Sequence, residues 1–138
     1  AGGNKVYNKI KELREAESLD FILDKTSCVG MCYREPLVEV IDETGNYLYG
    51  EIDEKKAVEI IDQHIQKHSP VKELIVKSDF FDTPDSKFFE GQVKIALRDC
   101  GYINPERIEE YEARSGYKAL EKIRINKKPK YFLIIQFL

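Results

Sequence analysis

Apolar and polar residues alternate with two different periods in the first part of the chain. Between residues 4 and 17, the apolar Val6, Ile10 and Leu13 recur every three to four positions among charged neighbours. This spacing predicts one amphipathic helix. Residues 21–25 instead place every second side chain on one face of an extended backbone and predict a strand.

A hairpin is predicted after this strand. The apolar runs 37–41 and 47–49 flank a turn signal, Glu-Thr-Gly-Asn, at 43–46. Pro36 has no backbone N–H to donate to a sheet and marks the start of the first strand of the hairpin.

A second amphipathic helix follows the hairpin. Asp53 has the side chain of an N-cap residue, and the Ser-Pro pair at 69–70 marks the end. The expected buried stripe consists of Val58, Ile61 and Ile65. The order of elements, helix, strands and helix, indicates an α/β fold.

The second half of the chain gives weaker signals. Residues 78–90 predict a loop that serves as a linker, and residues 92–98 alternate well enough for a strand, although a short helix fits the same letters. The Asn-Pro pair at 104–105 predicts a helix start. Residues 131–138 are apolar at all positions but one, which is typical of a strand buried on both faces.

Length and charge narrow the possible functions. The 138 residues suit one domain, or a small domain and part of another. The net charge is −3, with 25 acidic and 22 basic residues well mixed, so no broad positive field favours nucleic acid. No apolar run approaches the roughly 18 residues of a membrane span, so direct membrane insertion is not predicted and a cytoplasmic location is expected.

The candidate chemistry lies in one loop. Cys28 and Cys32 are separated by three residues, among them Gly30, which can adopt a positive φ. Such a loop can turn both sulfur atoms toward one metal atom. Two ordinary thiols packed as small hydrophobic groups are an equal alternative. An odd total of three cysteines points to metal or redox use in a reducing compartment rather than to a disulfide framework.

The spacing of the candidate ligands argues against zinc and against a reversible disulfide. Zinc would add His64 and His68, but 31 residues separate Cys32 from His64, far more than in a compact zinc finger. A reversible disulfide usually has two residues between its thiols rather than three.

An ordinary two-iron cluster needs four thiolates, of which Cys28 and Cys32 are two. Cys100 is expected to be a buried, unreactive thiol. No catalytic residue is predicted, because the sequence offers no glycine-rich phosphate loop and no spacing that supports a nucleophile with histidine.

Three stretches resemble a known family. They read TSCVGMCYREPLVEV at 26–40, AVEIIDQHI at 57–65 and FFEGQVKIALRDCG at 88–101. The first is similar to the second half of a thioredoxin-like two-iron ferredoxin domain. In the family it resembles, this domain is fused to the NADH-oxidising flavoprotein subunit of bacterial NAD-linked hydrogenases, formate dehydrogenases and complex I relatives. The third is similar to the opening of the flavoprotein domain of that subunit.

The resemblance implies roles for the three cysteines. It makes Cys28 and Cys32 the second pair of ligands of a [2Fe–2S] cluster and gives Cys100 and His64 no metal role. The first ligand pair would lie upstream of Ala1. The expected partners are the other subunits of an NADH-linked oxidoreductase complex. A metal-free thioredoxin-like module that docks a partner subunit stays open as the alternative.

The resemblance also implies an organisation of the chain. Residues 1–77 would form an incomplete thioredoxin-like domain, a mixed sheet with flanking helices that lacks its first strand. After the linker 78–90, residues 91–124 would form a short, mainly helical start of the flavoprotein domain.

The sequence departs from the family toward its end. The glycine-rich loop that binds NADH and FMN in that family does not occur in it, so the chain alone is expected not to oxidise NADH. The tail 125–138 matches nothing in the family, which favours a truncated or frame-shifted product. Residues 131–137 are expected to fill the place of the missing strand beside residues 21–25.

Overall fold

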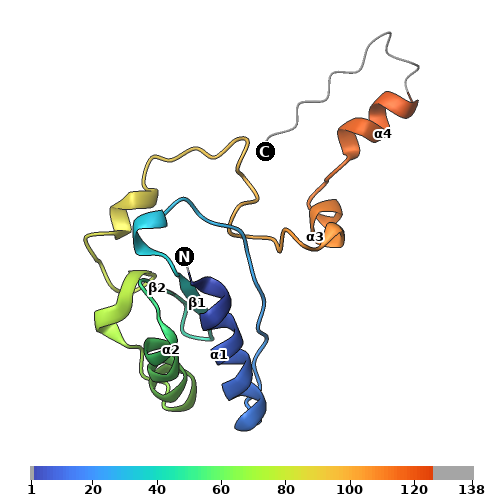
Figure 1. Cartoon of the computed structure of the whole chain (residues 1–138). Coiled ribbons are helices and arrows are strands. Elements are labelled where there is room, and N and C mark those ends of the chain that lie inside the picture. Colours follow the sequence, from blue (N-terminus) through green and yellow to red (C-terminus); the bar gives the residue numbers. More distant parts are fainter. Residues whose placement is uncertain (1, 126–138) are drawn as a thin grey trace.

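The structure is a computed structural model that describes residues 2–125. Its helices and strands are, in chain order, α1 (Gly3–Ala16), β1 (Val38–Ile41), β2 (Asn46–Tyr49), α2 (Glu54–Ile60), β3 (Ile75–Ser78), α3 (Ile108–Ala113) and α4 (Lys118–Ile125). Figure 1 shows α1, α2 and the strands gathered together, with α3 and α4 to one side. The expected strand at 131–137 lies outside the described residues.

The three strands form one antiparallel sheet in the order β1-β2-β3. Val40 pairs with Tyr47 in the predicted hairpin, and Tyr47 pairs with Ser78 on the other side. The predicted fold class is confirmed, because the chain is α/β with helices flanking the sheet and is consistent with a thioredoxin-like fold. Both strand pairs are antiparallel, so the parallel pair of a mixed sheet does not occur among these three strands.

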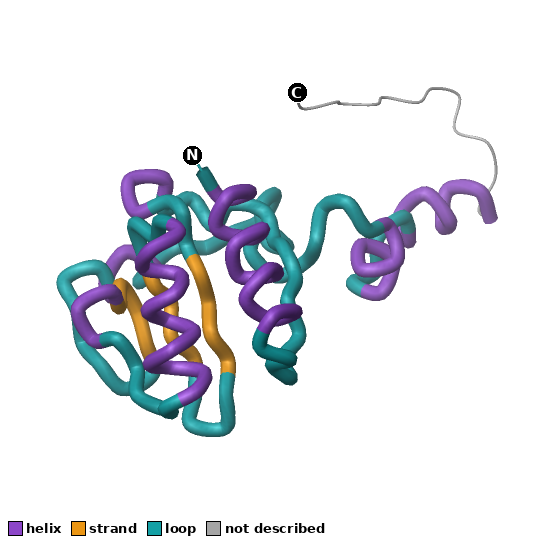
Figure 2. Tube along the Cα trace, turned by 60° about the horizontal axis from the view of Figure 1, so that its bottom comes forward, coloured by secondary structure: helices purple, strands orange, loops and turns teal. Residues whose placement is uncertain are grey.

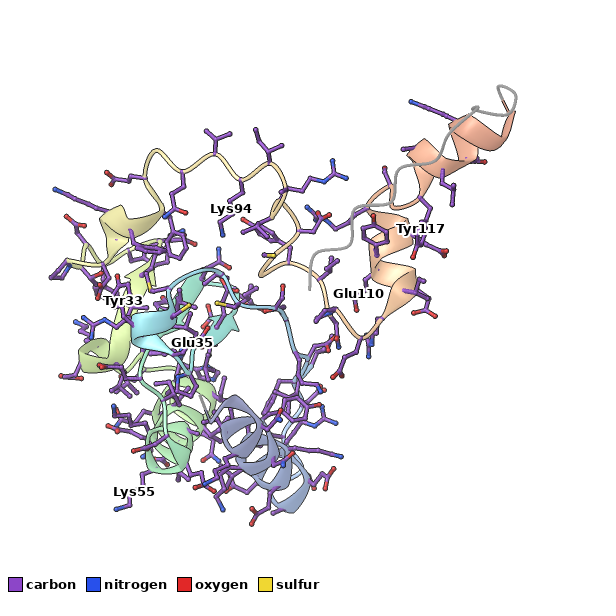
Figure 3. The ribbon with its side chains drawn as sticks, turned by 45° about the horizontal axis from the view of Figure 1, so that its top comes forward. Tyr33, Glu35, Lys55, Lys94, Glu110 and Tyr117 are labelled. Atoms are coloured by element: carbon purple, nitrogen blue, oxygen red, sulfur yellow. The ribbon has the colours of Figure 1, made fainter. Side chains whose placement is uncertain are left out.

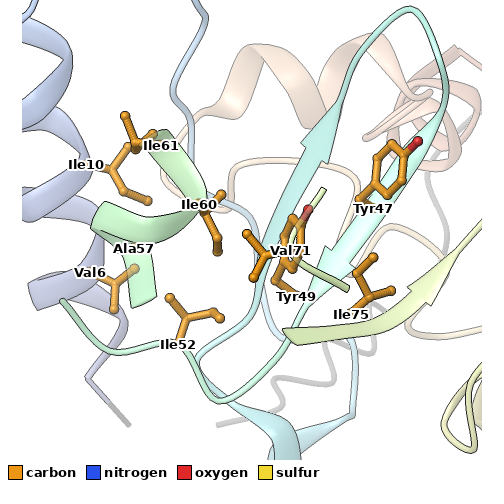
Figure 4. Packing of buried hydrophobic residues seen from close by; sticks show 10 residues of the cluster. All are labelled: Val6, Ile10, Tyr47, Tyr49, Ile52, Ala57, Ile60, Ile61, Val71 and Ile75. Atoms are coloured by element: carbon orange, nitrogen blue, oxygen red, sulfur yellow. The ribbon is translucent and has the colours of Figure 1, made fainter. Parts of the chain in front are cut away.

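One hydrophobic core lies between the sheet and two helices. Figure 2 shows α1 and α2 beside each other over the same face of the sheet. Val6 and Ile10 of α1 are buried, as the spacing predicted. They pack in one cluster with side chains from α2, the π-helical turn after it, the strands and the connections between them, shown in Figure 4: Tyr47, Tyr49, Ile52, Ala57, Ile60, Ile61, Val71 and Ile75. This cluster fixes the helices on the sheet.

The second helix begins where predicted. The Asp53 side chain accepts a hydrogen bond from the backbone N–H of Lys56 at 2.8 Å and so caps α2. The helix continues as a π-helical turn, Ile61–Gln66. The predicted stripe was partly wrong, because Val58 is 39% exposed whereas Ile60 is buried.

Residues 21–25 were predicted as a strand, but no strand within residues 2–125 pairs with them. Their side chains do alternate between half-buried and exposed, as an extended backbone requires. Phe21 and Leu23 pack against the core, and Ile22 is 95% exposed. The alternation was therefore predicted correctly, but within residues 2–125 no ladder of backbone hydrogen bonds joins this segment to a strand.

The region after the sheet differs more from expectation. β3 ends at Ser78, the first residue of the predicted linker, and Ser86–Phe89 form a short 3₁₀ turn within the linker. Residues 92–98 form no strand and no helix. The Asn104 side chain accepts a hydrogen bond from the N–H of Glu106, yet α3 begins only at Ile108. Within residues 2–125, no helix is long and apolar enough to cross a membrane.

Candidate metal centre

The two thiols of the loop lie side by side at the surface. The Sγ atoms of Cys28 and Cys32 are 3.8 Å apart, and both cysteines are free and exposed. Met31, next to Cys32, is fully buried. Burial of this side chain anchors the loop, while the sulfur atoms stay accessible to a metal ion in solution.

Gly30 gives the loop its shape. Its φ is +96°, a conformation that residues with a side chain rarely adopt. This turn lets the N–H of Gly30 donate to Sγ of Cys28 over 3.2 Å. A backbone N–H aimed at sulfur stabilises a thiolate, and in metal sites such hydrogen bonds tune the bound group.

A carboxylate completes the group. Within residues 2–125, Cys28, Cys32 and Glu35 bring one ligand atom each within 4.8 Å of the others. Cys32–Arg34 form a 3₁₀ turn that ends at Glu35. Side chains three residues apart eclipse in such a turn, which brings Glu35 over Cys32. Sequence reasoning missed Glu35, although its spacing of three from Cys32 was a usable signal.

The acidic groups raise the pKa of one thiol. A hydrogen bond to the Glu35 carboxylate favours the protonated form of Cys28 and is the main reason that its pKa rises to about 11. Burial and the neighbouring Cys32 act in the same direction, and the Gly30 N–H acts against them. As thiolates and a carboxylate, Cys28, Cys32 and Glu35 place three negative charges close together. A bound cation would stabilise this arrangement.

Ion pairs hold the loop at its downstream end. The Arg34 guanidinium contacts Asp85 at 2.8 Å and Glu51 at 2.9 Å. The hydroxyl of Tyr33 donates to the same Asp85 over 2.9 Å. Asp85 belongs to the segment predicted as a linker, so this segment packs directly on the candidate site.

The middle of the loop is held from the other side. Lys94 donates to the carbonyl of Val29 at 3.0 Å, and the N–H of Gly101 donates to Ser27 Oγ at 3.3 Å. A Cβ atom on Gly101 would lie 2.4 Å from Cγ1 of Val29, so the Val29 side chain packs against the Gly101 backbone as closely as only glycine allows. Residues 94–101 therefore contact and support the loop.

The extended segment before the loop is tied to the start of α3. Asn104 Nδ2 donates to Asp24 at 2.8 Å, and Arg107 contacts the same carboxylate at 3.2 Å. Lys25 pairs with Glu106 at 2.8 Å. These contacts account for the fixed path of residues 21–25, for which the sheet supplies no partner strand in the described part of the chain.

The remaining candidate ligands lie elsewhere. His64 is buried, with Nδ1 at 2.7 Å from the Tyr49 hydroxyl and Nε2 at 3.0 Å from Asp42. Both ring nitrogens therefore have partners, and the structure does not bring His64 or the exposed His68 to the two thiols.

Cys100 was expected to be buried but is half-buried. It lines a cavity of about 700 Å³, together with Val29 of the loop, Lys77 of β3 and Lys94. It does not belong to the metal-binding group found within residues 2–125.

Fold and site together define an α/β protein, consistent with a thioredoxin-like fold, with a group of two exposed thiols and one carboxylate. No model of a known protein family matches the chain. One stretch is similar to the NADP-reducing hydrogenase subunit HndC of Solidesulfovibrio fructosivorans, with 50% identity over 32 residues. That stretch is 23% of this chain and 6% of the hydrogenase subunit, so the chain spans a small part of the curated relative it matches.

Proposed function

We propose that this chain is part of an electron-transfer oxidoreductase subunit, in which Cys28 and Cys32 hold one iron of a [2Fe–2S] cluster. The observation that carries the proposal is the 3.8 Å separation of the two free sulfur atoms. Two metal–sulfur bonds of about 2.3 Å at a tetrahedral angle place their sulfur atoms about 3.8 Å apart. The similarity to a hydrogenase subunit supports the same class of function.

The residues of the loop fit half of such a cluster. Cysteine thiolates are the usual ligands of iron–sulfur clusters, and four are needed for the two-iron form. Cys28 and Cys32 supply two of them, and in this proposal the other two come from outside the described residues. When bound, the cluster supplies one-electron transfer.

The chain's own residues set the conditions of that transfer. The Gly30 N–H stabilises negative charge on Cys28, and buried Met31 keeps water from one side of the loop. Lys94 places a cation on the carbonyl between the two ligands. A nearby positive charge favours the more negative, reduced state and therefore raises the reduction potential.

In this proposal the partners are the other subunits of an NADH-linked oxidoreductase complex. FMN and NAD would belong to that complex and would bind to residues other than those of this chain. The position of the thiols at the surface supports exchange of electrons with a neighbouring subunit, because electron transfer requires close approach.

A metal-free docking module is the second candidate function. The side chains of Val93, Ile95 and Leu97 are 84%, 81% and 62% exposed on the segment that supports the loop. Such exposed apolar side chains are typical of a surface that binds another protein. In this case the two thiols would only stabilise the loop.

Anaerobic reconstitution with iron and sulfide separates the two functions. The chain would be tested alone and with its natural upstream sequence, by visible absorbance and by electron paramagnetic resonance after reduction. The electron-transfer proposal predicts a coloured protein with two iron atoms per cluster once all four thiolates are present. A colourless protein in both forms would contradict it and favour the docking module.

A further inference from the structure

We infer that Glu35 is a metal ligand, so that Cys28, Cys32 and Glu35 by themselves bind one divalent transition-metal ion such as Zn²⁺ or Fe²⁺. This site shares its sulfur atoms with the proposed cluster, but it does not depend on a second cysteine pair. The two kinds of occupant exclude each other, because each needs both thiolates.

The geometry of the group carries this inference. All three ligand atoms lie within 4.8 Å of one another, and the two sulfur atoms have the separation expected for two corners of a tetrahedron. In Figure 3 the labelled Glu35 lies beside the yellow sulfur atoms of the loop.

The donor set selects the type of ion. Two thiolates and one carboxylate suit Zn²⁺, Fe²⁺ and Co²⁺, whereas Mg²⁺ and Ca²⁺ prefer oxygen donors only. Three protein ligands with a water molecule in the fourth position form a normal tetrahedral site. Both cysteines are exposed, so a water molecule has access to that position.

The loop is already shaped for the ion. The turn at Gly30, the buried Met31 and the ion pairs of Arg34 hold the backbone on both sides of the ligands. Binding transfers the two thiol protons to the solvent and replaces them with one dication. The close approach of three acidic groups then becomes favourable, because the ion compensates their charge.

Cobalt is the probe for this site. The reduced, metal-free 138-residue chain would be titrated with Co²⁺ under argon, while thiolate-to-cobalt charge transfer and the visible bands of tetrahedral cobalt are recorded. One ion per chain is expected, with displacement by Zn²⁺. Native mass spectrometry would give the stoichiometry independently.

Variants separate Glu35 from its surroundings. Glu35→Gln should weaken Co²⁺ binding by at least about tenfold, since even partners outside the coordination shell contribute about 10–100-fold to metal affinity. Glu59→Gln removes the same charge from α2, where Glu59 is exposed and accepts a hydrogen bond from Gln63, and should leave the affinity unchanged. Circular dichroism would verify that both variants fold.

Three results would overturn the inference. They are a chain that binds no cobalt, a Glu35→Gln variant that binds as tightly as the natural chain, and one cobalt shared by four thiolates of two chains. None of them bears on reconstitution of a cluster with iron and sulfide. If no cluster forms but cobalt still binds, only the proposed function is rejected. If the cluster forms but cobalt binding does not need Glu35, only Glu35 is rejected as a ligand.

Discussion

Lys94 Nζ donates a hydrogen bond to the backbone carbonyl of Val29 at 3.0 Å, across 65 positions of the sequence. Val29 lies between the two thiols of the candidate site. A segment that was predicted to belong to a different part of the chain therefore contacts the middle of the loop that carries Cys28 and Cys32. The integrity of the site depends on this downstream segment.

Removing the Lys94 cation should loosen the loop. In Lys94→Met, the amides of Gly30 and Met31 should exchange hydrogen about tenfold faster or more, because a hydrogen bond from a charged group contributes about 1.5–3 kcal/mol. Exchange would be followed by mass spectrometry with the metal-free chain. Lys55→Met is the control, since Lys55 is exposed on α2 and lies far from the loop in Figure 3. Equal exchange in both variants would contradict a supporting role for Lys94.

The turn of the hairpin should make the fold sensitive to acid. The Asp42 carboxylate accepts hydrogen bonds from Thr44 and Gly45 and contacts His64. The bond from the Thr44 side chain is the largest cause that lowers the pKa of Asp42 from 3.8 to about 2. A carboxyl whose pKa is lower in the folded state contributes stability above pH 3.8, and this contribution disappears as the pH falls toward 2.

Asp42→Asn tests this relationship. The variant should be less stable at neutral pH and should lose less stability between pH 4 and pH 2 than the natural chain, as measured by urea unfolding. Asp62→Asn removes an exposed pair with Lys67 and should leave the pH dependence nearly unchanged. Parallel pH curves for Asp42→Asn and the natural chain would show that Asp42 has no such effect.

Two neighbouring residues of α2 should differ sharply in their effect on stability. Ile60→Ala creates a cavity in the core and should lower the free energy of unfolding by about 2–5 kcal/mol. Val58→Ala changes an exposed side chain and should stay within about 0.5 kcal/mol of the natural chain. Ile60 is 1% exposed and Val58 is 39% exposed, which is the physical basis of the difference. A larger loss in Val58→Ala would mean that the stripe predicted from the sequence was right.

Short sequence patterns predicted the helices and strands that are determined by contacts between residues close in sequence. The spacing of Val6 and Ile10 predicted the first helix and its buried face, and Asp53 predicted the start of α2. The turn signal at 43–46 predicted the hairpin. These signals suffice because the decisive contacts lie within a few residues of one another.

Features that depend on distant contacts were missed. The alternation in 21–25 indicated an extended chain, but it could not indicate whether another strand pairs with it. Residues 92–98 alternate in the same way, yet Lys94 points to Val29 and the segment packs on the loop instead of forming a strand. The spacing of Cys28 and Cys32 predicted that their sulfur atoms lie together, whereas Glu35 joins them through a 3₁₀ turn, and its spacing of three from Cys32 was not used.

A cysteine panel tests the central claim most directly. After anaerobic reconstitution of the chain with its upstream sequence, Cys28→Ser and Cys32→Ser should each lose most of the bound iron and the paramagnetic signal of the reduced protein. Cys100→Ser should keep both, because Cys100 lies outside the metal-binding group. A signal that survives in the Cys28→Ser and Cys32→Ser double variant, or that disappears in Cys100→Ser, would contradict the assignment of the loop as an iron–sulfur site.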